Sequence, residues 1–149
     1  MFSFNKTSKI APTLEYLLRF DGCSKGNPGK GGCGAVIYHN GTETWAGRKY
    51  VGERVTNNYA EYSGLILGLE KALELNIKAL TVQGDSLLVI QQMNNIYKCN
   101  SPNLIELYTY AIELTSKFDI IQFKHIYRNN NTRADQLSNI GLKLDFTYN

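Results

Sequence analysis

Four carboxylates stand at points of the sequence where element ends are expected. Asp21 and Asp85 each follow a short apolar run, so both are expected to close a strand. Glu61 and Asp135 are expected in the first turns of two helices. Parallel strands end at one edge of a sheet, which is where α/β proteins place their sites. The sequence therefore predicts that the four acids can converge at one edge.

Convergence of four carboxylates has a chemical consequence. Such groups repel one another unless a cation neutralises them. Hard divalent ions with oxygen ligands suit this donor set, and magnesium binds through a few carboxylates plus waters and substrate phosphates. Two such ions roughly 3.5–4 Å apart can hold both the attacking and the leaving oxygen of a phosphoryl displacement. The pattern thus predicts metal-assisted phosphodiester hydrolysis.

Taken singly, each acid also has an ordinary structural explanation in a turn or at a helix N-terminus. These explanations place Asp21 in a turn with Gly22, Glu61 in a capping box from Asn58, Asp85 before an N-cap at Ser86, and Asp135 in a capping box from Thr132.

The spacing of apolar residues predicts five strands and four helices in the order βββαβααβα. Asn40-Gly41 lies between two strand-like runs and indicates a hairpin. The predicted fold class is α/β: a mixed five-stranded sheet, with three antiparallel strands and then two parallel ones, flanked by helices. The expected strands span 14–20, 35–39, 43–51, 79–84 and 119–127, and the expected helices span 58–75, 86–94, 104–117 and about 132–144.

A glycine-rich segment, GCSKGNPGKGGCG at 22–34, is expected to form a loop. Gly29, Gly31 and Gly34 match the dinucleotide-binding fingerprint by spacing. That fingerprint requires a helix N-terminus after the glycines, whereas a strand-like run follows here. The segment also lacks the Ser or Thr that a Walker motif needs after its lysine, so the sequence argues against a nucleotide cofactor.

Composition limits the class of protein. The chain has 149 residues, 43% of them hydrophobic and 19% charged, with a formal net charge of +3, which fits one globular domain. We expect a disordered lead-in at 1–13, a single domain at 14–144 and a tail at 145–149. Three cysteines without metal-ligand spacing favour a cytoplasmic or other intracellular reducing compartment. No apolar run is long enough for a secretion signal or a membrane span.

Four short segments carry the acids: FDGCSKGNPG at 20–29, TNNYAE at 56–61, GDS at 84–86 and RAD at 133–135. Together they resemble the four motifs of type 1 ribonuclease H, in the family's order, and the similarity extends from about Leu14 to Lys143. The resemblance implies the ribonuclease H-like fold and an endonuclease that cuts the RNA strand of RNA/DNA hybrids. It implies two Mg²⁺ ions, for which Mn²⁺ can substitute, and 5′-phosphate and 3′-hydroxyl ends. It also makes Asp21, Glu61, Asp85 and Asp135 the metal-binding, catalytic set.

The same resemblance assigns substrate contacts. Residues in the minor groove would read 2′-hydroxyls, which distinguish RNA from DNA with little sequence preference; these are Gly22, Ser24, Asn57 and Asn58. Thr56 and Ser86 would help hold a phosphate of the DNA strand, and helix capping is an alternative role for Asn58 and Ser86.

Two departures from the best-known bacterial pattern stand out. The stretch between Met93 and Leu104 is too short for the extra helix and basic handle of many members, and it carries one base, Lys98. His125 lies ten residues before Asp135, which is the spacing of the family's catalytic histidine. However, HIYR at 125–128 looks like the short-loop members, in which this histidine belongs to the strand. Arg128 is therefore the stronger candidate for an auxiliary role, and His125 can also be an ordinary strand residue.

Three other interpretations remain open. A binding module for hybrids or double strands could keep the fold without catalysis, although clustered acids are of no use to a protein that only binds phosphates. The chain could also be a nuclease domain of a larger polymerase or integrase-related polyprotein. A flavodoxin-like domain is disfavoured because that fold opens with βαβ. We expect a monomer that needs no membrane and no obligatory protein partner.

Overall fold

Residues 14–144, the part of the chain that the computed structural model describes, form five strands and four α-helices. The predicted order βββαβααβα is confirmed; the expected lead-in at 1–13 and tail at 145–149 lie outside the described residues. The elements are β1 (Tyr16–Lys25), β2 (Gly29–His39), β3 (Thr42–Val55), α1 (Asn57–Glu74), β4 (Ala79–Gly84), α2 (Leu87–Met93), α3 (Ile105–Thr115), β5 (Ile120–His125), the short 3₁₀ helix η1 (Arg128–Asn130) and α4 (Thr132–Leu142).

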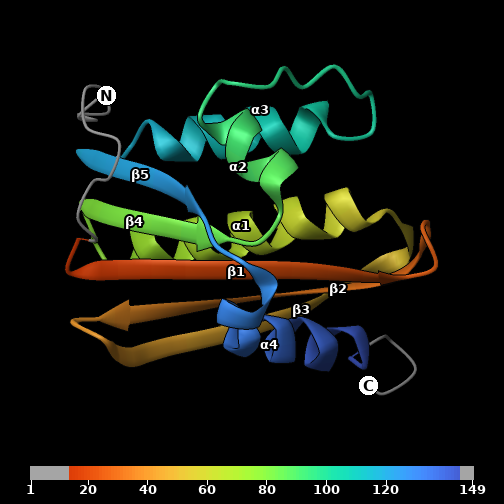
Figure 1. The fold of residues 1–149 in the computed structure, drawn as a ribbon, viewed down its shortest axis with the longest axis horizontal. Helices are drawn as coiled ribbons and strands as arrows, with labels where there is room; N and C mark the ends of the chain where they lie inside the picture. The colour runs from red at the N-terminus through yellow and green to blue at the C-terminus, as the bar shows by residue number, and fades with distance from the viewer. Residues whose placement is uncertain (1–13, 145–149) are drawn as a thin grey trace.

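The strands form one mixed sheet in the order β3-β2-β1-β4-β5 (Figure 1). The first three strands are antiparallel neighbours, whereas β4 pairs in parallel with both β1 and β5. The hairpin turn predicted between β2 and β3 is present, and Asn40 and Gly41 both have positive φ there, as this kind of turn requires. Because β1, β4 and β5 point the same way, their carboxyl ends meet at one edge of the sheet.

The glycine-rich segment is not the loop that the sequence predicts. β1 and β2 run through most of it and pair as far as Lys25 and Lys30, leaving only a tight turn between them. Two of the glycines serve helix packing: a Cβ on Gly22 would lie 2.2 Å from the carbonyl carbon of Ala60 in α1, and one on Gly32 would lie 2.2 Å from a backbone nitrogen in α4. The glycines thus let α1 and α4 approach opposite faces of the sheet (Figure 1).

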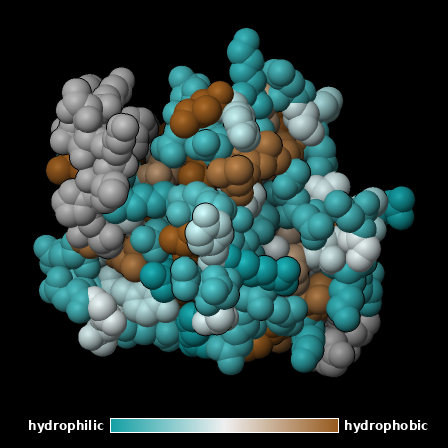
Figure 2. Space-filling view, viewed as in Figure 1, coloured by the Kyte–Doolittle hydropathy of each residue, from teal (hydrophilic) through white to brown (hydrophobic). Residues whose placement is uncertain are grey.

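The core fills the space between the sheet and α1, α2 and α3. Tyr62, Leu65 and Leu69 place a helical stripe of α1 against strand residues such as Leu18 and Leu80, and all five are fully buried. Each such side chain contributes about 1.5–3 kcal/mol by leaving water. On the outside, teal hydrophilic residues cover most of the view in Figure 2, and hydrophobic ones gather over α2 and α3. None of the described helices is long and apolar enough to cross a membrane.

The helix starts differ from two predictions. Helix α1 begins at Asn57 with Thr56 as its N-cap, so Asn58 is not the cap and Glu61 lies beyond the first turn. Helix α4 begins at Thr132, which is therefore not its N-cap. The capping boxes considered as the alternative explanation for Glu61 and Asp135 are therefore not formed, because each acid lies one or more positions too deep in its helix to close such a box. The N-cap predicted at Ser86 is confirmed, since its Oγ accepts from the Val89 N–H at 3.3 Å.

Candidate active site

Three of the four acids meet at the sheet edge. The register pairs Phe20 of β1 with Gly84 of β4, so the next residues along, Asp21 and Asp85, are neighbours. Asp21 lies within β1 rather than at its end, because the strand continues to Lys25. Glu61 joins them from α1, which the missing side chain of Gly22 allows to come close to β1. One carboxylate oxygen from each acid lies within 4.8 Å of the others.

Asp135 borders this group from the first turn of α4. It lies on the Asp21 side of the cluster, where a hydrogen bond from one carboxyl to the other helps raise the pKa of Asp21. Its Oδ1 is 3.9 Å from a guanidinium nitrogen of Arg128, whose side chain is 83% exposed. Asp135 is therefore beside the three-acid cluster, facing the same cavity from the opposite helix.

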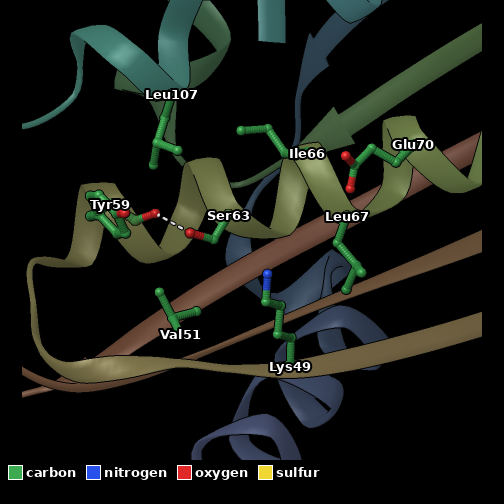
Figure 3. Close-up of a pocket in the computed structure, with 8 residues that line it drawn as sticks. All are labelled: Lys49, Val51, Tyr59, Ser63, Ile66, Leu67, Glu70 and Leu107. Atoms are coloured by element: carbon green, nitrogen blue, oxygen red, sulfur yellow. Dashed lines mark hydrogen bonds between the residues drawn. The ribbon is translucent and has the colours of Figure 1, made fainter. Parts of the chain in front are cut away.

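The four acids line one open cavity of about 340 Å³. Gly22, Ser24, Asn57 and Arg128 also line it, as does Cys23, whereas Thr56, Asn58, Ser86 and His125 do not. A smaller cavity of about 140 Å³ lies between β3, α1 and α3 (Figure 3). Its single carboxylate, Glu70, already accepts a hydrogen bond from Tyr110. The chemistry of the sequence motifs therefore belongs to the larger, acid-lined cavity.

Of the predicted substrate residues, Thr56, Asn58 and Ser86 lie outside the cavity lining, at the starts of α1 and α2, and hydrogen bonds hold Thr56 and the two lining residues Asn57 and Ser24 in place. Thr56 Oγ1 accepts from the Tyr59 N–H at 3.1 Å and from Asn103 Nδ2 at 3.2 Å. The Asn57 N–H, which has no partner within the helix, donates to Asn27 Oδ1 at 3.0 Å. Ser24 Oγ donates to the Val55 carbonyl at 2.8 Å. These bonds fix a polar rim beside the acids.

The two auxiliary candidates occupy different places. His125 ends β5 and is exposed, with Nε2 3.2 Å from the backbone oxygen of Asp85 and its ring packed edge-on against Tyr127. Arg128 begins η1 and lines the cavity. Because β5 stops at His125, Tyr127 lies outside the strand predicted for it. Segment 94–104 contains no helix, as its short length predicts.

Two polar residues that the sequence did not single out contact the acids. Asn131 Nδ2 donates to Asp85 Oδ2 at 2.9 Å, and Ser138 Oγ lies 3.5 Å from Asp21 Oδ2. Both side chains are buried. In the sequence, Asn131 belongs to a run of three asparagines that indicates a polar loop, and Ser138 is an ordinary residue of the last predicted helix. Only the position of Asn131 next to the start of α4 could have indicated its role.

The electrostatics of the cluster favour protonation when no cation is present. Burial, then the charge of Asp85 and a hydrogen bond with Asp135, raises the pKa of Asp21 from 3.8 to about 7, although hydrogen bonds with the Gly22 backbone and the Glu61 side chain act in the opposite direction. Burial and the charges of Asp21 and Asp85 raise the pKa of Glu61 well above its usual value. Asp21 is only 5% exposed and Glu61 9%. Deprotonating both acids near neutral pH is thus costly unless a positive charge compensates for them.

The donor set fits a hard divalent cation. Glu61 Oε1 is buried without a hydrogen-bond partner, which is costly unless something else binds it. The nearby ligand atoms are carboxylate oxygens, which magnesium and manganese prefer. Asp21, Glu61 and Asp85 would hold such an ion, and Asp135 could hold a second one from its side of the cavity.

We expect the metal-free protein to lose stability as the pH rises. A carboxyl with a higher pKa in the folded chain binds its proton more tightly there, so it stabilises the fold at low pH. This contribution from Asp21 is lost between about pH 4 and about pH 7. In EDTA, Tm should therefore be at least ~5 °C lower at pH 8 than at pH 5. Mg²⁺ should recover most of the loss, and Glu61→Gln should flatten the dependence; an EDTA profile that rises with pH would contradict the charge cluster.

Comparison with known proteins gives a consistent assignment. The reverse transcriptase-like family matches residues 19–141. The bifunctional protein Rv2228c of Mycobacterium tuberculosis is 40% identical over 128 residues, which make up 85% of this chain and 35% of that protein. Its solved N-terminal RNase H domain has a TM-score of 0.82 at 39% identity, covering 86% of this chain and 93% of the solved one. Ribonuclease HI of Halobacterium salinarum is 39% identical over 124 residues, which make up 83% of this chain and 62% of that protein.

A third similar protein is LC11-RNase H1, whose structure was solved in complex with an RNA/DNA hybrid. Its TM-score is 0.80 at 32% identity, with 86% of this chain and 96% of the solved one covered. The chain spans only 35% and 62% of the lengths of the mycobacterial and halobacterial relatives. The family match nevertheless covers most of the chain, and the solved domains agree with it in fold. This chain therefore belongs to the reverse transcriptase-like family, as a type 1 ribonuclease H domain.

Proposed function

We propose that this chain hydrolyses the RNA strand of RNA/DNA hybrids as a metal-dependent endonuclease. The observation that carries the proposal is the cluster of Asp21, Glu61 and Asp85 in an open cavity, with Asp21 and Glu61 buried and one Glu61 oxygen left without a partner. The names of the Halobacterium relative and of the LC11 complex support the substrate. In a protein that only bound nucleic acid, this negative charge would lower the affinity by repelling the phosphates.

The proposed roles follow from the placement of the side chains. Asp21, Glu61, Asp85 and Asp135 hold two Mg²⁺ ions, which Mn²⁺ can replace. When bound, such a pair supplies Lewis-acid stabilisation of the attacking and leaving oxygens of a phosphodiester. The carboxylates orient the ions and, once ionised, neutralise them inside the cavity. In the proposed reaction a water molecule loses a proton and its oxygen bonds to phosphorus, while the bond between phosphorus and the 3′ oxygen breaks. The 3′ oxygen takes up a proton, which leaves 5′-phosphate and 3′-hydroxyl ends.

The polar rim supplies the proposed substrate contacts. Gly22, Ser24 and Asn57 line the cavity, and with Asn58 they read the minor groove of the hybrid through its 2′-hydroxyls. Thr56 and Ser86, at the starts of α1 and α2, hold a phosphate of the DNA strand. Their capping bonds fix the hydroxyls in place, so capping and phosphate contact are compatible.

The two auxiliary residues differ in what their positions allow. Arg128 faces the cavity beside Asp135 and is exposed, so we assign it a contact to phosphate or to the departing product. His125 contacts the backbone oxygen of Asp85 and does not line the cavity, so we propose at most an auxiliary role for it at the cavity rim. The domain contains all the proposed machinery and is proposed to act as a monomer.

Cleavage of end-labelled nucleic acids tests the function. With Mg²⁺ the protein should cut the RNA strand of a hybrid, and it should leave single-stranded RNA, duplex DNA and duplex RNA intact under the same conditions. EDTA should stop cleavage, and Mn²⁺ should restore it. Mapping the ends should give 5′-phosphates and 3′-hydroxyls. A folded protein that binds the hybrid equally well with EDTA but cuts none of the four substrates would instead be a binding module.

A further inference from the structure

Asn131 lies at the junction of the segments that carry the acids. It is 1% exposed and precedes α4 as its N-cap residue. Its Nδ2 donates to two acceptors at 2.9 Å: the backbone oxygen of Phe20, which precedes Asp21, and Oδ2 of Asp85. Its own backbone oxygen accepts from the N–H of Asp135 at 3.0 Å. One buried side chain and its carbonyl therefore connect β1, the end of β4 and the start of α4.

Burial of the Asn131 side chain carries a free-energy cost at its oxygen atom. Oδ1 is buried and has no hydrogen-bond partner, which is unfavourable for a polar atom removed from water. The side chain does not cap α4 either, because no N–H of the helix donates to it. The Asn131 amide therefore acts through the two hydrogen bonds that Nδ2 donates, and one of these bonds ends on Asp85.

We infer that Asn131 is a positioning residue for Asp85. Its side-chain Nδ2 holds one oxygen of the Asp85 carboxylate against rotation, and the second bond from Nδ2, to the Phe20 carbonyl, ties that carboxylate to the strand of Asp21. The distance between the two acids is then set by a shared hydrogen-bonded partner. Hydrogen bonds to ligating carboxylates tune metal sites in this way. The inference rests on the proposed function, because it assigns Asp85 to the cation.

Asn131→Ala is the test, with Asn130→Ala as the matched control. Asn130 is exposed in the same loop and belongs to η1. For Asn131→Ala we expect kcat to fall about 10–100-fold at a fixed Mg²⁺ concentration, the size of effect typical of lost second-layer partners. The Mg²⁺ concentration for half-maximal activity should rise, whereas KM for the hybrid should stay within about 2-fold of wild type, because the rim residues are untouched. Asn130→Ala should match wild type in all three.

A second readout does not depend on cleavage. Mg²⁺ titration of the free protein, by calorimetry or by the Mg²⁺-induced rise in Tm, should show weaker binding for Asn131→Ala and unchanged binding for Asn130→Ala. A purely structural role predicts a lower Tm in EDTA with an unchanged Mg²⁺ titration, and that result would overturn the inference. If Asn131→Ala does not fold, Asn131→Ser, which keeps a small hydrogen-bond donor, replaces it. If neither variant folds, Asn131 is required for folding itself and the inference is wrong.

The two proposals fail in different ways. If the wild-type protein binds Mg²⁺ but cuts no hybrid, the proposed function is wrong, while the titration still tests the link between Asn131 and the cation site. If wild type cuts hybrid and Asn131→Ala does so with the same kcat and Mg²⁺ dependence, only the positioning role is wrong.

Discussion

Asp85→Asn should lower the rate of hybrid cleavage on the order of 1,000-fold or more, which corresponds to about 4 kcal/mol of lost transition-state stabilisation. The substitution removes one negative charge from the three-acid cluster and leaves its shape unchanged. The amide oxygen can still accept the bond from Asn131 Nδ2, so the site should stay assembled. Hybrid binding should persist, because the negative charge that the substitution removes repels the phosphates of the hybrid. Steady-state cleavage and a binding titration measure the two effects separately.

The control for this variant is Asp119→Asn, which removes the same charge from an exposed position just before β5. It should cleave at the wild-type rate. A further check separates loss of charge from misfolding: Asp85→Asn should be more stable than wild type in EDTA at pH 8, because the Asp85 charge raises the pKa of both Asp21 and Glu61. Wild-type cleavage by Asp85→Asn would remove Asp85 from the proposed metal site.

Gly22→Ala should abolish most of the protein's stability. Its Cβ would lie 2.2–2.3 Å from the backbone of Ala60 and Glu61, and these atoms belong to a helix that cannot shift as a flexible side chain could. Such overpacking should cost about 4 kcal/mol or more, a large part of the 5–15 kcal/mol typical of a domain. Any folded fraction should also lose activity, because Glu61 would be displaced from Asp21. Urea unfolding followed by circular dichroism measures the effect.

Gly52→Ala is the matched control for the glycine variant. Gly52 is also a strand glycine, but its Cβ would meet only the end of the Val55 side chain, at 3.2 Å. This change should alter the free energy of unfolding by no more than ~1 kcal/mol. Equal loss of stability in both variants would mean that the close approach of β1 and α1 is not what requires glycine at position 22.

The parts of the fold that were predicted correctly depend on local patterns. Apolar spacing is read over one element at a time, so the order of strands and helices and the turn at Asn40-Gly41 follow from neighbouring residues. Asp85 and Ser86 fall where predicted because the strand before them ends at Gly84 and a helix follows directly. Convergence of the acids follows from the rule that parallel strands share an edge.

The parts that were missed depend on distant partners. Gly22, Gly32 and Gly34 looked like loop residues, because the reason for them lies in α1 and α4, which enter the sequence more than twenty residues later. Nothing near Asn131 in the sequence shows that its amide reaches Phe20 and Asp85. Asn58 and Thr132 are not the N-caps of α1 and α4, although the sequence allows it. Several Ser, Thr and Asn residues near a helix start can each serve as the N-cap, and tertiary packing selects among them.

The contact of α1 with β1 at Gly22 also bears on how a cation enters the site. Since main chain lies directly against main chain there, the separation between Asp21 and Glu61 is set by the backbone, and their side chains need little rotation to reach a common ion. Loading the site then requires little loss of conformational entropy in the protein. The rate of that step should be governed by how fast the incoming ion exchanges its water, so that Mn²⁺, which exchanges water faster than Mg²⁺, should load faster at equal concentration.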